Sequence, residues 1–328
     1  PWECEYSYGG EADLHRHYER CQKNPGHKNF IPVDKFSIEY LPEDYRDKEV
    51  VDYIRAVSDL TVRVSVGYVS EKRPETVPNT NKPYPCYSVR GQCRLTVGTG
   101  FVRSVDVFTS DLGHHCGCKD CLNSSTPEMN FAIVEVITAT HVVFDGLEGE
   151  HTTCHLFFDR GGTPDTCSGV VTLPGMSNVF NNVPEDCCFM YHYTHDLDLA
   201  RKLLQTTQQM YRLSYILTND NKFYFRIVKQ NRDVLDKQPL LFLVSHPHGC
   251  SKQISLGYVT SAHKFNDAIV NLFYNTATCP GSSGAHVLVT ENFTSLGLEK
   301  VLLFSCAVHC GVSEEQHEFN FCESDKGQ

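Results

Sequence analysis

His141 and Ser283 are the residues of this sequence whose types and surroundings best suit nucleophilic catalysis. His141 follows a hydrophobic segment at 130–139 that is predicted to form a strand, so its side chain is expected at a strand end beside a cleft. Ser283 lies in the sequence Cys-Pro-Gly-Ser-Ser-Gly at 279–284, a glycine-bracketed loop that would expose one serine. A serine hydroxyl is a weak nucleophile until a histidine accepts its proton, so the pair predicts covalent catalysis.

Asp196 and Gly281 would complete such a site. Asp196 precedes an alternating apolar stretch, and a buried carboxylate is needed to fix the tautomer of the catalytic histidine. A side chain at position 281 would block the approach of a substrate carbonyl to the backbone. The N–H groups of Gly281 and Ser283 are therefore predicted to form an oxyanion hole, in which each donor typically contributes about 3–4 kcal/mol.

The order of these motifs resembles that of the chymotrypsin-like serine peptidases. The sequences T-A-x-H, D-h-x-h (h, apolar) and G-x-S-G follow one another at spacings that suit a double β-barrel. The resemblance covers about two thirds of the chain, and it implies these roles: His141 as general base, Asp196 as the orienting carboxylate, Ser283 as nucleophile and Gly281 in the oxyanion hole. Asp198 is the rival carboxylate, although it would point the opposite way on a strand.

Two departures from the digestive enzymes indicate a subgroup. Ser282 stands where trypsin-like enzymes have an aspartate that pairs with a newly cut N-terminus, and Val142 replaces a cysteine that follows the catalytic histidine. Both changes resemble intracellular, bacterial or viral members of the superfamily. We therefore expect an intracellular protein, in the cytoplasm or the nucleus.

The expected specificity pocket comprises Ala277, Thr278 and His309. Ala277, at the expected pocket floor, cannot supply the carboxylate that basic specificity requires. Thr278 and His309 resemble the threonine and histidine with which glutamyl endopeptidases and viral 3C-type enzymes bind an acidic or amide side chain before the scissile bond (position P1). The sequence thus predicts a Glu or Gln preference; the alternative is that His309 is only a core residue.

Residues 114–121, His-His-Cys-Gly-Cys-Lys-Asp-Cys, form a second chemically suggestive run. Cys116, Cys118 and Cys121 could supply three of the four ligands that structural zinc requires. The fourth ligand is predicted from neighbouring strands, the candidates being Cys154, Cys188 and His192. Free thiols and disulfides are the alternatives, and a catalytic zinc is not expected because no H-E-x-x-H motif occurs.

A weaker zinc site is predicted near the N-terminus. Leu-x2-His-x3-Cys, ending in His17 and Cys21, resembles the second half of a small zinc finger, and Cys4 would add a third ligand. The first half is incomplete, and His15 or His27 could substitute. The alternative is a polar helix that keeps only a remnant of such a finger.

These sites are expected to be positioned by a mainly β fold. Seven short segments with strand character follow residue 95, which is typical of a barrel, and a helix is predicted from 197 to about 211. We expect two six-stranded barrels with the active site between them. The predicted division is a zinc-finger-like segment (1–30), a mixed α/β helix-strand extension (31–95) and a chymotrypsin-like domain (96–318, with barrels at about 96–205 and 212–318).

Composition limits the possible partners. The 328 residues carry 29 Lys and Arg against 40 Asp and Glu, a net charge of −11, so nucleic acid is an unlikely partner because its binding requires positive charge. No apolar run is long enough to cross a membrane. The expected partner is a protein or peptide substrate of a serine endopeptidase, and the oligomeric state is not indicated. The competing hypothesis is a non-catalytic module that uses the cleft and the N-terminal segment to hold a partner.

Overall fold

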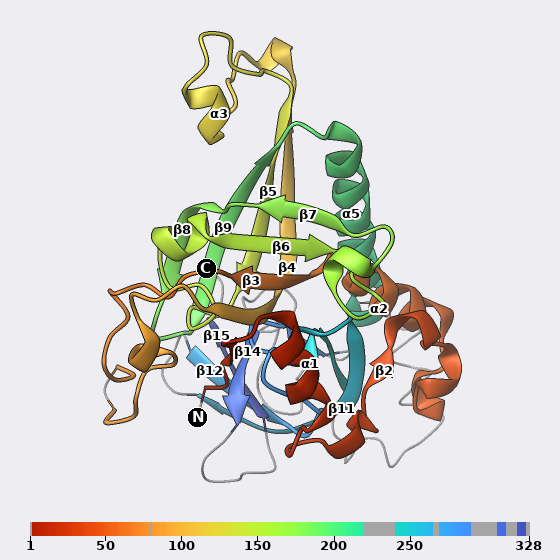
Figure 1. Cartoon of the computed structure of the whole chain (residues 1–328). Helices are drawn as coiled ribbons and strands as arrows, with labels where there is room; N and C mark the ends of the chain where they lie inside the picture. Colours follow the sequence, from red (N-terminus) through yellow and green to blue (C-terminus); the bar gives the residue numbers. More distant parts are fainter. Residues whose placement is uncertain are drawn as a thin grey trace.

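The structure is a computed structural model that describes residues 2–78, 80–219, 240–264, 269–289, 307–312 and 320–325 (Figure 1). These residues form two antiparallel sheets and few helices, which confirms the predicted mainly β class with two sheets. No helix in the described part of the chain is long and apolar enough to cross a membrane. The strand predicted at 222–228 lies outside the described residues, as does most of the one predicted at 301–308.

The first sheet has eight strands in the order β7-β6-β3-β4-β5-β9-β8, with β1 paired to β4. Its strands are β1 (Glu5–Ser7), β3 (Thr61–Val66), β4 (Leu95–Phe108), β5 (Phe131–Thr138), β6 (Thr152–Leu156), β7 (Val171–Pro174), β8 (Ser177–Asn182) and β9 (Cys187–Thr194). β4 and β5 extend as a long hairpin that carries the short helix α3 (Lys119–Leu122) at its far end (Figure 1, top).

The second sheet has seven strands in the order β13-β10-β11-β12-β15-β14, with β2 paired to β11. Its strands are β2 (Ile31–Pro32), β10 (Leu240–Ser245), β11 (Gln253–Lys264), β12 (Ile269–Tyr274), β13 (Leu288–Val289), β14 (Val308–Val312) and β15 (Asn320–Asp325). Each sheet therefore gains one strand, β1 or β2, from the N-terminal part of the chain. Among the described residues, and without these additions, the second sheet has six strands and the first has seven, compared with six predicted for each barrel.

The remaining elements are helical. The α-helices are α1 (Glu11–Glu19), α2 (Lys48–Leu60), α3, α4 (Gly146–Glu150) and α5 (Leu197–Asn219). The short 3-10 helices are η1 (Pro25–His27), η2 (Val33–Lys35), η3 (Ile38–Tyr40), η4 (Glu43–Tyr45), η5 (Tyr87–Val89), η6 (Ser110–Leu112), η7 (Pro164–Thr166) and η9 (Pro247–Gly249). α2 and α5 pack against each other and against β4.

The predicted boundary between an extension and a barrel at residues 95 and 96 is wrong. β3 lies inside the first sheet, hydrogen-bonded to β4 on one side and to β6 on the other, although the sequence analysis assigned it to the extension. Apolar and polar residues alternate along this strand, but both of its faces are buried. Val62 and Val64 are buried as expected, but Arg63 on the other face is buried too, where it pairs with Glu11 of α1 at 2.8 Å. The N-terminal helix therefore covers the face that was expected to meet solvent.

Candidate active site

His141 lies just after β5 and is fully buried. Its Nδ1 lies 2.6 Å from Oδ2 of Asp186, and its backbone N–H donates to the other carboxylate oxygen at 2.9 Å. Asp186 occupies the turn between β8 and β9 with a positive φ of 49° and is also fully buried. A carboxylate can only accept hydrogen bonds, so Asp186 holds the proton of His141 on Nδ1 and fixes the plane of the ring.

The prediction that Asp196 orients the histidine is therefore wrong. Asp196 lies one residue before α5, where its Oδ1 accepts a hydrogen bond from the backbone N–H of Leu199 at 2.9 Å. This is the usual role of an aspartate ahead of a helix, because the first N–H groups of a helix have no partner within it. The rival Asp198 is exposed and pairs with Arg201 one helical turn later. The apolar spacing after Asp196 belongs to a helix rather than to a strand.

Asp186 was missed although a sequence signal exists. It directly follows Val-Pro-Glu at 183–185, a turn-forming segment, and it precedes the apolar strand β9, which pairs with β5. β5 ends at Thr138, three residues before His141. Because the two strands are antiparallel and Thr138 pairs with Cys188, the start of β9 must lie beside His141. The backbone N–H of Thr140 also donates to the carbonyl of Asp186 at 3.1 Å.

A buried ion pair contacts the backbone of His141. Arg73 comes from the loop between β3 and β4 and binds both carboxylate oxygens of Glu148, each at 2.7 Å. The same guanidinium donates to the carbonyl oxygen of His141 at 2.9 Å. The sequence analysis did not identify either residue. The pairing with Glu148 raises the pKa of Arg73 despite its burial, which by itself would lower it.

The loop at 279–284, which carries Ser283, has a backbone conformation that depends on glycine. Gly281 has φ of +92°, and a Cβ at this position would lie 2.6 Å from the backbone oxygen of His246, so only glycine fits. The carbonyl oxygen of Pro280 accepts from the backbone N–H of His248 at 2.6 Å. In a trans peptide the N–H points away from the carbonyl, so the N–H of Gly281 is turned to the opposite side of the loop, away from His248.

The N-terminal segment passes through the cleft between the two sheets. The carbonyl oxygen of Glu3 lies 2.6 Å from Oγ of Ser283 and 2.8 Å from Nε2 of His141. The backbone N–H of Glu3 donates to the carbonyl of Cys310 at 3.3 Å, and Trp2 forms an isolated β-bridge with the residue after Cys310. The Trp2 ring also stacks on His141, with centroids 5.7 Å apart. Downstream, β1 pairs with β4, so the segment is bound by backbone pairing on both sides of Ser283.

The carboxylate of Glu3 points into the predicted specificity pocket. Nζ of Lys23 lies 2.7 and 2.8 Å from its two oxygens, and Nε2 of His309 lies 3.6 Å from Oε2. Burial alone would raise the pKa of Glu3, but the contacts with His309 and Lys23 outweigh it and lower the pKa to about 2. His309 is buried and shares a hydrogen bond with the hydroxyl of Tyr274 through Nδ1 at 2.7 Å. Its other ring nitrogen is thereby directed at the carboxylate.

Thr278 and Ala277 have roles that differ from those predicted. The Thr278 hydroxyl donates to Asn320 at 2.6 Å and accepts from Lys23 at 2.8 Å, so it reaches Glu3 only through Lys23. Ala277 packs against a small apolar cluster that includes Cys21 instead of forming the floor under Glu3. The sequence analysis missed Lys23 because it lies 260 residues before the nucleophile, on a segment that was interpreted as a finger.

The cysteine run lies at the end of the β4–β5 hairpin and converges on His195. Nε2 of His195 lies 3.2 Å from Sγ of Cys116, 3.5 Å from Cys121 and 3.8 Å from Cys118. Backbone N–H groups approach the sulfurs as well, including that of Glu128 to Cys121 at 3.3 Å. Burial raises the pKa of Cys116 to about 12. The four side chains thus form a Cys3His group with the donor set of a structural zinc site.

None of the three predicted fourth ligands belongs to this group. Cys154 and Cys188 are fully buried in the main hydrophobic core, and Nδ1 of His192 shares a hydrogen bond with the carbonyl of Gly175 at 3.1 Å. His195 takes their place because it directly follows β9, whose last residue, Thr194, lies opposite the start of β5. The end of β9 therefore adjoins the base of the loop that carries the cysteines.

The predicted site of Cys4, His17 and Cys21 does not form. Sγ of Cys4 lies 2.9 Å from Sγ of Cys86, and Nδ1 of His17 lies 2.7 Å from a carboxylate oxygen of Glu5. Helix α1 ends at Glu19, before Cys21, so His17 and Cys21 do not share one helical face. Cys21 instead lies 3.5 Å, sulfur to sulfur, from Cys279 of the nucleophile loop.

Comparisons with known proteins find distantly similar structures and no similar sequence. No protein-family profile and no curated protein sequence matches the chain. Its structure is similar to the HtrA-type protease AlgW with a tripeptide, at 9% identity and a TM-score of 0.39, over 83% of this chain and 58% of that chain. It is also similar to an inactive form of the Rv3671c protease from M. tuberculosis H37Rv, at 12% identity and a TM-score of 0.39, over 85% and 90%. This chain thus spans less than two thirds of the AlgW chain.

Proposed function

We propose that the protein is a serine endopeptidase that cleaves peptide bonds through an acyl-enzyme on Ser283. The observation that carries this proposal is the position of the Glu3 carbonyl oxygen, within hydrogen-bonding distance of both Ser283 and His141. This contact brings a backbone carbonyl, a serine hydroxyl and a histidine anchored by Asp186 into one site, and these are the groups that acyl transfer uses.

Each residue has a defined role in the proposed mechanism. Asp186 keeps a proton on Nδ1 of His141, so Nε2 is free to accept the proton of Ser283 as its Oγ bonds to the substrate carbonyl carbon. The carbonyl oxygen then becomes an oxyanion, which the N–H groups of Gly281 and Ser283 stabilise. The intermediate collapses as His141 passes the proton to the leaving amine. Water, deprotonated by His141, then hydrolyses the ester and restores Ser283.

We infer that the preferred residue before the scissile bond is glutamate. Lys23 supplies a positive charge to the Glu3 carboxylate, and His309 adds an imidazole nitrogen. A P1 carboxylate can only accept, so the favourable form of His309 carries its hydrogen on Nε2 and accepts from Tyr274 at Nδ1. An apolar side chain would leave Nε2 of the buried His309 without a partner, which typically costs about 1–3 kcal/mol.

Substitution of His309 is expected to slow cleavage after glutamate much more than cleavage after leucine. His309→Ala should lower kcat/KM by about 10- to 100-fold for a peptide containing Trp-Glu-Cys-Glu, because the contact of the imidazole with the P1 carboxylate is lost. A peptide with Leu in place of the first Glu should change by less than about 3-fold. The measurement is the rate of cleavage of both peptides by the wild type and the variant.

The matched control is His286→Ala, since His286 is a half-buried histidine of this part of the fold whose Nδ1 lies 3.1 Å from the carbonyl oxygen of Ala307. It should affect both peptides equally. Preferred cleavage after Phe, Tyr or Leu, unchanged in His309→Ala, would mean that His309 is only a core residue.

We also propose a structural zinc ion at Cys116, Cys118, Cys121 and His195. Zinc–sulfur bonds of about 2.3 Å and zinc–nitrogen bonds of about 2.0 Å at tetrahedral angles put neighbouring ligand atoms about 3.3–3.8 Å apart. The three distances from His195 to the sulfurs agree with this spacing. The ion would stabilise the end of the β4–β5 hairpin, where the ligands pack against only a small apolar cluster.

Removal of one imidazole is expected to release this ion. His195→Ala should lower the zinc content of the purified full chain by about one ion and reduce Tm by several degrees, since structural zinc binding contributes directly to folding stability. His192→Ala, three residues earlier, is the control and should retain the ion. Equal zinc contents in the two variants would contradict His195 as the fourth ligand.

A further inference from the structure

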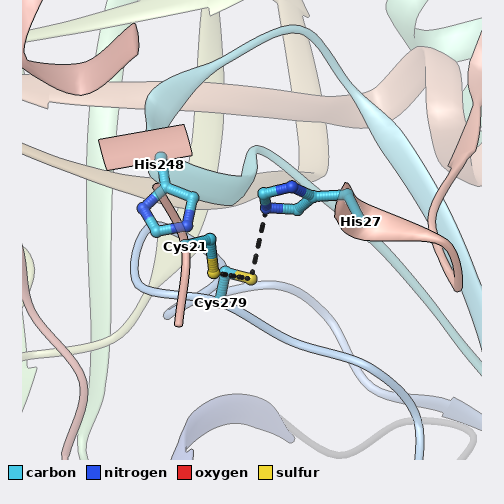
Figure 2. A group of neighbouring side chains, drawn as sticks. All are labelled: Cys21, His27, His248 and Cys279. Atoms are coloured by element: carbon cyan, nitrogen blue, oxygen red, sulfur yellow. Dashed lines mark hydrogen bonds between the residues drawn. The ribbon is translucent and has the colours of Figure 1, made fainter. Parts of the chain in front are cut away.

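Four buried side chains meet beside the nucleophile loop, and they form a ligand set that differs from the N-terminal site predicted from the sequence. They are Cys21, which follows α1, His27 at the end of η1, His248 of η9 and Cys279, four residues before Ser283 (Figure 2). Each offers one ligand atom, and all four atoms lie within 4.8 Å of one another. The two pairs come from opposite ends of the chain, so only the tertiary fold brings them together.

The distances within this group suit a tetrahedral ion. The two sulfurs lie 3.5 Å apart, and Sγ of Cys279 lies 3.6 Å from Nε2 of His27. Tetrahedral zinc with two sulfur and two nitrogen ligands requires separations of about 3.3–3.8 Å. Two thiolates and two imidazoles are also the ligand types that favour zinc over magnesium, calcium or manganese.

The hydrogen bonding of His248 leaves its Nε2 available to bind a metal ion. Nδ1 lies 2.6 Å from Oε2 of Glu5, so it donates its hydrogen to that carboxylate. Nε2 then carries a free lone pair, and this buried atom has no hydrogen-bond partner among the described residues. A histidine whose far nitrogen donates to a carboxylate while the near nitrogen faces an ion is a recurring arrangement in zinc sites. Glu5 is itself held by His17 at 2.7 Å.

Asn24 provides N–H groups to both sulfurs. Its backbone N–H donates to Sγ of Cys21 at 3.3 Å, and its side-chain amide donates to Sγ of Cys279 at the same distance. Such donors stabilise thiolates, the form in which cysteine binds a metal. The amide of Asn24 also donates to the carbonyl of Thr278 at 2.8 Å, which joins the N-terminal segment to the start of the nucleophile loop.

We propose that Cys21, His27, His248 and Cys279 bind one structural zinc ion that fastens the N-terminal segment to the nucleophile loop. Two of the ligands flank the peptide that shapes the oxyanion hole, because Cys279 precedes Pro280 and the backbone N–H of His248 binds the Pro280 carbonyl at 2.6 Å. The ion also holds residues 21–27, and with them Lys23 in the specificity pocket. This second consequence rests on the proposed function, whereas the presence of the ion does not.

A disulfide between Cys21 and Cys279 is the alternative that the sulfur separation allows. It would use both thiols but would leave the unpartnered Nε2 of His248 and the converging His27 without a role. The experiment below therefore distinguishes the two by metal content and by the state of the thiols.

The first measurement is zinc per full chain, together with the alkylation of each cysteine before and after chelation. In Cys116→Ser, which disables the hairpin site, one zinc should remain, with Cys21 and Cys279 unreactive until a chelator is added. Cys21→Ser combined with Cys116→Ser should bind none, while Cys167→Ser combined with Cys116→Ser, a buried-cysteine control, should retain one. A Cys21–Cys279 disulfide would overturn the proposal. So would Cys116→Ser protein that holds no zinc and has both thiols alkylated at once. Neither result requires the Cys21→Ser variant to fold.

The second measurement is the rate at which a fluorophosphonate probe labels Ser283 in Cys116→Ser. Chelation should lower this rate at least 10-fold, and restoring zinc should recover it, because the oxyanion loop loses its support. An unchanged rate in protein that has demonstrably lost its zinc would refute the link to the nucleophile loop. Zinc binding without any labelling of the wild type would instead count against the proposed peptidase.

Discussion

Replacement of Ser283 by alanine is expected to lower kcat by about 10⁶-fold for cleavage of a peptide containing Trp-Glu-Cys-Glu. The reason is that no other hydroxyl is held against the Glu3 carbonyl oxygen and His141 together in the described part of the chain. The fold should survive, because the loop depends on the positive φ of Gly281 and Gly284 rather than on the serine hydroxyl. The measurement is the cleavage rate together with Tm.

Ser282→Ala is the matched control for this prediction. Ser282 is buried beside the nucleophile, where its hydroxyl accepts from the backbone N–H of Cys279 at 3.2 Å and contacts Ser245 at 3.1 Å. Its loss should reduce stability by about 1 kcal/mol and leave fluorophosphonate labelling of the loop intact. Absence of labelling in the wild type, or equal cleavage by Ser283→Ala, would favour the non-catalytic interaction module.

Asp186→Asn is expected to reduce kcat/KM by about 10⁴-fold while preserving the geometry around His141. An amide can donate to Nδ1, which allows the ring to place its proton on Nε2, the atom that must accept the proton of Ser283. The backbone N–H of His141 would still find an oxygen at position 186, so the loss should appear in activity far more than in Tm. The measurement is the pH profile of kcat/KM for variant and wild type.

Asp196→Asn provides the contrast. Asn caps a helix about as well as Asp, so this change should alter neither the stability nor kcat/KM appreciably. If Asp196→Asn were the variant that lost activity and Asp186→Asn remained active, the assignment of the orienting carboxylate from the structure would be wrong.

Local sequence was sufficient for the strands and helices whose side-chain pattern repeats. The apolar residues Val50, Val51, Ile54 and Val57 recur at helical spacing and are buried on α2. The alternating valines of β3 were likewise predicted as a strand. What the pattern did not indicate is that Arg63 of this strand is covered by α1, because burial on the second face depends on a segment more than 40 residues earlier.

The sequence by itself identified His141 as the candidate base and Ser283 as the candidate nucleophile, because each lies in a motif with an unusual local geometry. His141 follows the end of a strand, and Ser283 lies in a loop whose conformation requires glycine. Both residues can therefore be recognised from their neighbours in the sequence. The orienting carboxylate, the pocket lysine and the histidine that joins the three cysteines of the hairpin end have no such local mark. Asp186, Lys23 and His195 become partners of distant residues only through strand pairing and the return of the N-terminal segment to the cleft. Tertiary structure decided them because an aspartate, a lysine or a histidine is chemically competent in many local contexts, and only proximity in the fold selects one.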